Sequence, residues 1–475
     1  MKKSILITID TLRADHLGCY GYLRKTSPAI DWLAERSLFY EKAFSPISYT
    51  VPSIVSMLTS RYPSFHYMGF LQGTKRLPSK REITLQEVLH NKGVRTAAFV
   101  STIMLNKRHI GLNRGFDIYD DTVHESELNR KDVLFRRAEE TMSKALRWLD
   151  SHHKESFFLW IHFMDVHGPY NPPPPYNKLF INHPSSDDPY WNKDPILLDR
   201  IIDTPGLFSR APIDYQPGIF SYQVLDKKVD QKGSVVGFQK DVRHYISQYD
   251  GAIRYVDDQI KRLFACLEKM NIFDETAIIV TSDHGEAFGE SNVFFFHGLT
   301  VTLDQIKIPL IIKLPGTESK KIAEPVSLID IMPTLLDLYG VSPNSTDIHG
   351  ISLVSSDVKK ERAVMSQIVS QLSTIIGDYQ FLYCGGWFEN KYGNIFGIDI
   401  DRTHLQLNET WRMFNITTGK EIGLHEHCGL ENYQEHSKTF IQKTFEAGTT
   451  HDRSKLFNMA KKIKDKLAAL GYVDL

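Results

Sequence analysis

The sequence predicts an α/β fold in which a β-sheet is flanked by helices on both faces. Short β-branched runs alternate with segments of helical periodicity along most of the chain, which is the pattern of such folds. Residues 156–164 and 277–281 read as continuous apolar strands, and such strands are typical of a parallel sheet that is buried on both faces. Both runs end in polar residues, where open α/β sheets place their functional sites.

The individual elements follow from local patterns. The predicted helices carry apolar residues three or four positions apart, and Gly93 closes one of them with the residue type that helix C-termini prefer. The predicted helices are residues 26–36, 84–92, 248–270 and 327–338. The predicted strands of the main sheet are residues 4–9, 95–101, 156–164 and 277–281.

A chain of 475 residues is too long for one ordinary compact core. The last quarter changes pattern and predicts a small antiparallel sheet followed by helices, the last at residues 455–470. We therefore expect a main domain of residues 1–355 and a C-terminal α+β subdomain of residues 356–475. Residues 171–240 are irregular and rich in Pro, Asp, Asn and aromatic residues. A loop of this length predicts a lid or a substrate-binding insert, or else a partly disordered surface excursion.

Charged residues make up 24% of the chain, and the formal net charge is -1. This balance gives no reason to expect nucleic-acid binding or a polybasic membrane anchor. No stretch approaches the roughly 20 apolar residues of a membrane span, and the apolar run at residues 5–9 is too short for a secretory signal. We therefore expect a cytoplasmic protein with no membrane span.

Polar side chains follow three of the predicted strands. Asp10 follows the first strand, Asp165 and His167 follow the strand at 156–164, and Asp283 and His284 follow the strand at 277–281. The carboxyl ends of parallel strands meet at one edge of a sheet. We therefore expect these side chains to converge.

Two carboxylates and an imidazole at strand ends can hold a divalent cation, and Asp10, Asp283 and His284 provide them. A fourth ligand is needed, and the Thr50 hydroxyl can supply it. Coordination would turn this weak nucleophile into a strong one near neutral pH. Pro52 favours the first position of a helix, which predicts that Thr50 lies just outside a helix N-terminus. The N–H groups at such an end attract a phosphate or a sulfate.

Taken in order, these segments resemble the sulfatase family of the alkaline phosphatase superfamily, and the resemblance spans most of the chain. It implies a central mixed β-sheet flanked by helices, with a smaller C-terminal α+β subdomain. The matching segments are residues 10–21, 50–53, 57–60, 84–89, 163–170, 282–286, 296–298, 308–312 and 330–338.

The resemblance also implies a role for each candidate site residue. The expected metal ligands are Asp10, Thr50, Asp283 and His284. The expected catalytic residues are Thr50 as nucleophile, His167 at the substrate or leaving group, and His297 at the non-bridging oxygens. Lys107 and Tyr170 are expected to bind substrate. An imidazole at position 167 could protonate a leaving alkoxide.

Four departures from the family pattern point in one direction. Sulfatases oxidise a Cys or Ser to formylglycine, and Thr50 cannot give that aldehyde. The arginine that helps to hold the aldehyde hydrate is replaced by Ile54, and the usual second metal-site Asp by Thr11. Many members have Asn where this chain has His284. Because calcium prefers oxygen ligands, the imidazole favours Mn²⁺ or Zn²⁺ over Ca²⁺ or Mg²⁺.

The predicted function is therefore metal-dependent cleavage of a phosphate or phosphonate (di)ester through a covalent phospho-threonine. Water as acceptor would make the protein a hydrolase, and an alcohol would make it a transferase. The substrate would be a small-molecule, sugar or lipid-derived ester. One alternative is hydrolysis of sulfuric esters by unmodified Thr50. Another is a non-catalytic protein that keeps the fold for binding.

Overall fold

A computed structural model describes most of the chain up to residue 422. The longer described ranges are residues 2–66, 82–127, 133–181, 188–198, 238–290, 294–298, 300–342, 348–354, 362–368, 371–384, 410–418 and 420–422. Gln223 and the two-residue strands at 201–202, 219–220, 228–229 and 235–236 are described as well. Most of the predicted insert and the helix expected at 455–470 therefore lie outside the described residues.

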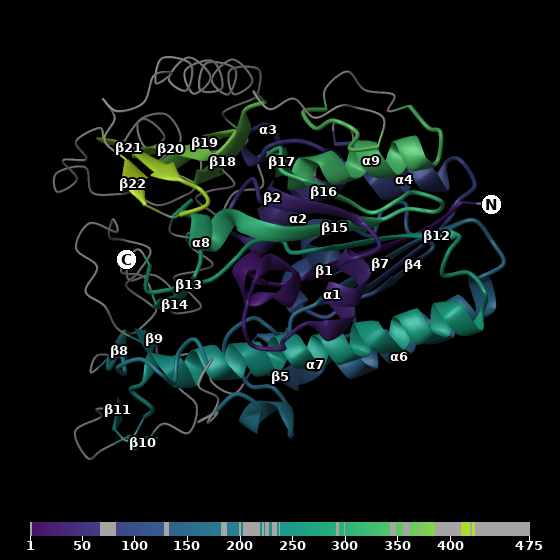
Figure 1. Ribbon diagram of the computed structural model, residues 1–475. Helices are drawn as coiled ribbons and strands as arrows, with labels where there is room; N and C mark the ends of the chain where they lie inside the picture. Colours follow the sequence, from purple (N-terminus) through teal and green to yellow (C-terminus); the bar gives the residue numbers. More distant parts are fainter. Residues whose placement is uncertain are drawn as a thin grey trace, which may run out of the picture.

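A nine-stranded mixed sheet forms the centre of the molecule (Figure 1). Its strands run in the order β16-β2-β15-β12-β1-β7-β3-β4, and β17 pairs with β2. Strands β12, β1, β7, β3 and β4 are parallel to one another, while β15 is antiparallel to both β12 and β2. The bounds are β1 Lys3–Ile9, β2 Leu38–Phe44, β3 Arg95–Val100, β4 Ile118–Asp120, β7 Phe157–Phe163, β12 Thr276–Thr281, β15 Lys307–Lys313, β16 Lys320–Ile322 and β17 Val326–Ser327. The mixed sheet that the resemblance implied is confirmed.

Helices cover both faces of this sheet, because successive side chains of each buried strand point to opposite sides. In β1, Ile5 and Ile7 pack with one set of helices, and Leu6 packs with the other. The first set is α1 Pro28–Ala34, α6 Ala138–His152 and α7 Val242–Lys269. The second set is α2 Thr50–Thr59, α4 Leu85–His90 and α9 Ile331–Leu338. Figure 1 shows α6 and α7 side by side along one face, with α4 and α9 across the sheet from them.

The four helices predicted at 26–36, 84–92, 248–270 and 327–338 all form, but α7 begins at Val242, six residues before the expected start at 248. The side chain of Asp241 accepts a hydrogen bond from the backbone N–H of Arg243 and caps the extra turns. Tyr245 and Ile246 continue the buried face of the helix. The cap and the longer buried face together extend the helix.

The start of α2 also differs from the prediction. The helix begins at Thr50, with Tyr49 as its N-cap, so that Pro52 is the third residue rather than the first. A proline is tolerated there because the first-turn N–H groups have no partner within the helix. The Thr50 hydroxyl therefore belongs to the first turn of the helix instead of lying outside it.

The small antiparallel sheet expected in the C-terminal part is confirmed. Its strands are β18 Val364–Ile368, β19 Gln371–Ile376, β20 Tyr379–Cys384, β21 Thr410–Asn415 and β22 Glu421–Ile422, paired in that order. Ile375 and Leu382 of this small sheet pack against Phe44 at the end of β2 and against Val301. Figure 1 shows this sheet at one end of the molecule, above α8.

Shorter elements complete the described fold. The strands are β5 Glu125–Ser126, β6 Leu134–Phe135, β8 Ile201–Ile202, β9 Ile219–Phe220, β10 Lys228–Val229, β11 Val235–Val236, β13 Ala287–Phe288 and β14 Phe294–Phe296. The helices are α3 Pro63–His66, α5 Lys107–Ile110 and α8 Leu303–Ile306. Among the helices that the structure describes, none is long and apolar enough to cross a membrane.

Candidate active site

The carboxyl ends of β1, β7 and β12 are joined by short hydrogen bonds. The backbone N–H of Asp10, just after β1, donates to the carbonyl of Phe163 at the end of β7 (2.8 Å). Ser282, just after β12, donates its hydroxyl to the carbonyl of Ile9 (2.7 Å) and accepts the N–H of Leu12 (2.9 Å). These bonds hold the polar residues that follow the three strands in one place, as the sequence predicts.

The loop after β1 carries a strained residue. Thr11 has a φ of 56°, which is uncommon for a β-branched side chain. This turn brings the Thr11 N–H to 3.2 Å from Oδ1 of Asp283. Backbone strain of this kind clusters at functional sites. The turn leaves the Asp10 and Asp283 carboxylates side by side.

Asp10 and Asp283 are buried, and each has a carboxylate oxygen without a hydrogen-bond partner among the described residues: Oδ1 of Asp10 and Oδ2 of Asp283. Burial, followed by the charges of Asp283 and Glu286, raises the pKa of Asp10 well above its usual value. Ligand atoms of Asp10, Asp283 and His162 all lie within 4.8 Å of one another. Unpaired buried charges are costly unless an ion neutralises them. The residues present therefore fit a divalent cation.

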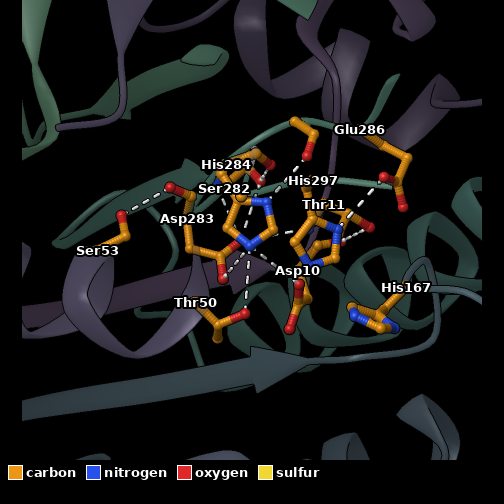
Figure 2. A network of polar contacts seen from close by, with 12 residues as sticks. Asp10, Thr11, Thr50, Ser53, His167, Ser282, Asp283, His284, Glu286 and His297 are labelled. Atoms are coloured by element: carbon orange, nitrogen blue, oxygen red, sulfur yellow. Dashed lines mark hydrogen bonds and ion pairs between the residues drawn. The ribbon is translucent and has the colours of Figure 1, made fainter. Parts of the chain in front are cut away.

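His284 presents a lone pair to this group. Its Nδ1–H donates to the carbonyl of Gly285 (2.9 Å), so that Nε2 is the unprotonated nitrogen of the neutral ring. That nitrogen lies 3.8 Å from Oδ1 of Asp10 and 3.6 Å from Oδ2 of Asp283. Figure 2 shows the His284 ring directed at both carboxylates and at Thr50. The bond to Gly285 thus prepares the ring to bind a cation.

The first turn of α2 positions Thr50. Its Oγ1 lies 3.2 Å from Nε2 of His284, and the residue is buried. One turn further, the Ser53 hydroxyl donates to the carbonyl of Asp283 (2.7 Å), which fixes the helix start against the end of β12 (Figure 2). The free N–H groups and the dipole of a helix N-terminus favour an anion. Thr50 therefore combines a hydroxyl with a setting suited to a charged ester.

Two further histidines border the group. The His297 ring lies 4.4 Å from the His284 ring and 5.1 Å from the His167 ring, between centroids. Nδ1 of His297 lies 3.3 Å from Oε1 of Glu286, which is fully buried (Figure 2). Burial raises the pKa of Glu286 to about 8. The rings of His284, His297 and His167 thus follow one another as neighbours, and His284 is the one next to Thr50.

A cavity of about 100 Å³ opens beside His167. Asp165 is buried in its wall, with the Arg137 guanidinium 3.8 Å away. Burial raises the pKa of Asp165 to about 7. The cavity is lined by Glu125, Ser126, Glu127, Phe135, Arg137, Met164, Asp165, His167, Gly168, Pro169 and Asn171. It offers room for part of a substrate next to a candidate proton donor.

The comparison with known families decides the identity of this arrangement. The sulfatase family model matches residues 2–341, which is well over half of the chain. The chain belongs to the sulfatase family. This places it in the alkaline phosphatase superfamily, as the motifs predict.

Curated relatives are similar to the chain over lengths that range from about a fifth to about seven tenths of it. Human iduronate 2-sulfatase is 25% identical over 399 residues, covering 71% of this chain and 68% of its own. The uncharacterized sulfatase YidJ of Escherichia coli (strain K12) is 23% identical over 357 residues, covering 70% and 67%. The multifunctional alkaline phosphatase superfamily protein PehA of Trinickia caryophylli is 37% identical over 103 residues, covering 21% and 20%.

Solved structures show the same fold. The phosphonate monoester hydrolase of Agrobacterium radiobacter has a TM-score of 0.64 at 16% identity, covering 94% of this chain and 96% of its own. BT4656, solved with its substrate D-glucosamine-2-N,6-O-disulfate, has a TM-score of 0.65 at 16% identity, covering 96% and 98%.

Within this sulfatase-family site, the structure brings together six of the eight predicted residues around one space. These are Asp10, Thr50, His167, Asp283, His284 and His297. Tyr170 lies behind them, because its buried hydroxyl donates to Oε2 of Glu286 (3.0 Å). Lys107 begins α5 and pairs with Asp121 (3.3 Å), and nearly half of its side chain is exposed (47%). In the described part of the chain, no contact joins Lys107 to the group.

Two buried residues of the site were missed by the sequence reasoning. Glu286 belongs to a motif that the sequence singles out, but only the structure shows it against His297. His162 falls within a run that the sequence predicts as a continuous apolar strand, and it is the one imidazole within β7. A polar side chain near the carboxyl end of such a strand was the signal that could have revealed it.

Proposed function

We propose that this sulfatase-family protein is a metal-dependent hydrolase of phosphate or phosphonate (di)esters, with Thr50 as the nucleophile. One observation carries the proposal. The Thr50 hydroxyl lies 3.2 Å from Nε2 of His284, beside the unpartnered oxygens of Asp10 and Asp283. A threonine in this place provides a hydroxyl for direct attack, and it cannot become formylglycine.

A divalent cation held by Asp10, Asp283 and His284 would lower the pKa of the Thr50 hydroxyl and offset charge on the ester oxygens. The donor set contains imidazole nitrogen as well as carboxylate oxygen. Such a mixed set favours Mn²⁺ or Zn²⁺ over Ca²⁺.

The residues of the chain would then divide the reaction between them. The Thr50 hydroxyl would give up its proton to solvent when it ionises. Oγ1 then forms a bond to phosphorus while the bond to the leaving oxygen breaks, and the N-terminus of α2 stabilises the charged oxygens. His167 or His297 protonates the leaving oxygen. Water then displaces the phospho group from Thr50 and completes hydrolysis. An alcohol in place of water would give transfer.

Two kinds of relative support phosphorus chemistry. Phosphonate monoester hydrolases of Agrobacterium radiobacter and Silicibacter pomeroyi share the fold. The PehA relative is described as multifunctional within the alkaline phosphatase superfamily. The fold therefore accommodates phosphorus esters, and the threonine at the nucleophile position favours them here.

The second candidate function is hydrolysis of sulfuric esters. It is favoured by the curated relatives, several of which are named as sulfatases, including human iduronate 2-sulfatase and the ulvan-active sulfatase of Formosa agariphila. Structural relatives solved with sugar ligands make a sugar ester a reasonable substrate under either candidate.

Side-by-side assays on an aryl phosphodiester, an aryl phosphonate monoester and an aryl sulfate separate the two functions. We expect the phosphorus esters to be turned over faster. Thr50→Ala should lower kcat/KM by roughly 10³-fold or more, because it removes the nucleophile, and Thr50→Ser should retain part of the activity. Intact-protein mass spectrometry during turnover should detect a phospho adduct on Thr50.

Thr59→Ala is the matched control. Thr59 is a buried threonine at the other end of α2, where its hydroxyl donates to the carbonyl of Val55 (2.7 Å). This variant should keep wild-type kcat/KM. A clear preference for the aryl sulfate would contradict the phosphorus assignment. Wild-type turnover by Thr50→Ala would show that Thr50 is not the nucleophile.

A further inference from the structure

His162 lies where the sheet directs it toward the candidate metal ligands. It is the sixth residue of β7 and stands opposite Thr8 of β1 in the strand register. Alternation places it on the same face as Trp160, whose indole N–H donates to the Thr8 hydroxyl (2.9 Å). Asp10 comes two residues after Thr8, so that the same alternation directs it to this face of the sheet. Nε2 of His162 lies 4.0 Å from Oδ2 of Asp10.

Neither ring nitrogen of His162 has a hydrogen-bond partner among the described residues, and the side chain is fully buried. A buried polar atom left without a partner costs about 1–3 kcal/mol, so native proteins nearly always satisfy such atoms. The unpartnered Oδ1 of Asp10 and Oδ2 of Asp283 lie in the same small volume. Three buried residues from the ends of three neighbouring strands, each with an unpartnered polar atom, thus lie close together, as the ligands of an ion do.

The distances suit direct coordination. Ligand atoms around a tetrahedral zinc ion lie about 3.4 Å apart. Here Nε2 of His284 lies 3.6 Å from Asp283 and 3.8 Å from Asp10, and Nε2 of His162 lies 4.0 Å from Asp10. The separation of 4.0 Å is too long for a hydrogen bond from His162 to the Asp10 carboxylate. A small cation between His162 and the two carboxylates would satisfy these buried atoms, and His284 lies beside the same carboxylates.

We infer that His162 is a direct ligand of the divalent cation, so that two imidazoles and two carboxylates hold the ion and a fifth position is left for the Thr50 hydroxyl. The inference deepens the proposed function, since it concerns the ion which that function requires. Two nitrogen ligands shift the preference of the site toward Zn²⁺ and away from Ca²⁺, beyond what His284 alone would do.

The test counts the imidazoles bound to the ion. Protein labelled with ¹⁵N-histidine is loaded with Mn²⁺ and examined by pulsed EPR, which detects imidazole nitrogens coupled to the metal. Wild type should show two such nitrogens, and His162→Gln should show one. Competition with chelators measures Zn²⁺ and Ca²⁺ affinity in parallel. His162→Gln should lose more Zn²⁺ affinity than the roughly 10- to 100-fold that an outer-shell partner costs, with a much smaller change for Ca²⁺.

His66→Gln is the matched control, because His66 is also a fully buried histidine, with its ring nitrogen 2.8 Å from the Ser56 hydroxyl. It should keep two coupled nitrogens and wild-type affinities. A single coupled nitrogen in wild type would overturn the assignment of His162, even if the variant failed to fold. Two coupled nitrogens in both wild type and His162→Gln would also overturn it.

The outcomes of this test distinguish a wrong ligand assignment from a wrong proposed function. An ion bound through one imidazole, with phosphorus esters still turned over, would remove only His162 from the ligand set. Two bound imidazoles without phosphorus-ester turnover would leave the ligand assignment standing and contradict the proposed reaction. Absence of any bound ion would overturn both.

Discussion

The reactive nitrogens of the site are oriented by contacts on the far side of each ring. The His284 Nδ1–H donates to the carbonyl of Gly285, and this bond directs Nε2 toward Thr50. The His297 ring is approached in the same way by Glu286, which the Tyr170 hydroxyl holds in turn. Such outer partners set the tautomer and the orientation of an imidazole. The supporting residues are therefore as much a part of the site as the residues facing substrate.

Asp165 supplies a pH-dependent prediction at the residue scale. Burial raises its pKa to about 7, above the roughly 3.9 of an unfolded chain. The folded protein therefore binds this proton more tightly than the unfolded chain does. The resulting contribution to the free energy of unfolding is fully present below about pH 4 and is lost as the pH rises through 7. Asn at position 165 stays neutral. We expect the Tm difference, Asp165→Asn minus wild type, to increase from pH 4 to pH 7 and then level off.

Thermal unfolding of both proteins across this range checks the expectation. The change in the free energy of unfolding from this group is at most about 4 kcal/mol, since about three pKa units contribute 1.36 kcal/mol each. A Tm difference that stayed constant from pH 4 to pH 8 would contradict a raised pKa at Asp165.

At the scale of elements, the C-terminal sheet holds the segment that carries His297. The side-chain oxygen of Gln371 in β19 accepts the N–H of Val301 (3.0 Å), and the Gln380 amide in β20 donates to the Val301 carbonyl (2.7 Å). Val301 follows His297 by four residues. Two strands that supply no candidate catalytic side chain thus anchor the chain next to the site.

Gln380→Ala should therefore lower the reaction rate, although Gln380 has no proposed contact with the substrate, because it removes a support of the segment that carries His297. We expect kcat to fall by about 10-fold or more, since a shift of about 1 Å at a catalytic group can cost 10²-fold. Steady-state kinetics measure the effect. Gln86→Ala is the control. Gln86, in α4, is also a buried glutamine, and its side-chain amide donates to the backbone carbonyl of Leu112 (3.0 Å). Equal losses of kcat in both variants would point to general destabilisation.

At the scale of the whole molecule, the fold places like charges together. The carboxyl ends of the neighbouring strands β1 and β12 bring Asp10 and Asp283 side by side in the interior, where the first turn of α2 meets the end of β12. Each carboxylate comes from a separate part of the chain. Their repulsion opposes folding unless a cation is bound.

Removing the ion should therefore lower the stability of the whole protein. At an ion concentration 100-fold above Kd, binding contributes about 2.7 kcal/mol, which corresponds to a few degrees in Tm for a large domain. We expect EDTA to lower the Tm of wild type by this amount, and added Mn²⁺ or Zn²⁺ to restore it, as measured by calorimetry. Asp283→Ala should unfold at the same temperature with and without EDTA. An EDTA-dependent Tm in that variant would place the ion elsewhere.

The amino-acid sequence by itself determines the sheet, its covering helices and the places of the candidate metal ligands. Largely apolar runs identify strands such as residues 156–164, because burial on both faces of the sheet selects apolar side chains at most positions. Asp10, Asp283 and His284 are found because they directly follow such runs. These features are local, so a pattern within a few residues reveals them.

The tertiary structure decides what depends on partners far away in the chain. His162 joins the ligands only because β7 pairs with β1 in a register that sets it opposite Thr8. Glu286 supports His297 across a loop, and Lys107 turns to Asp121 instead of the site. No local pattern encodes strand register or packing between distant segments. The neighbours of each side chain, and with them its chemistry, are therefore set by the fold.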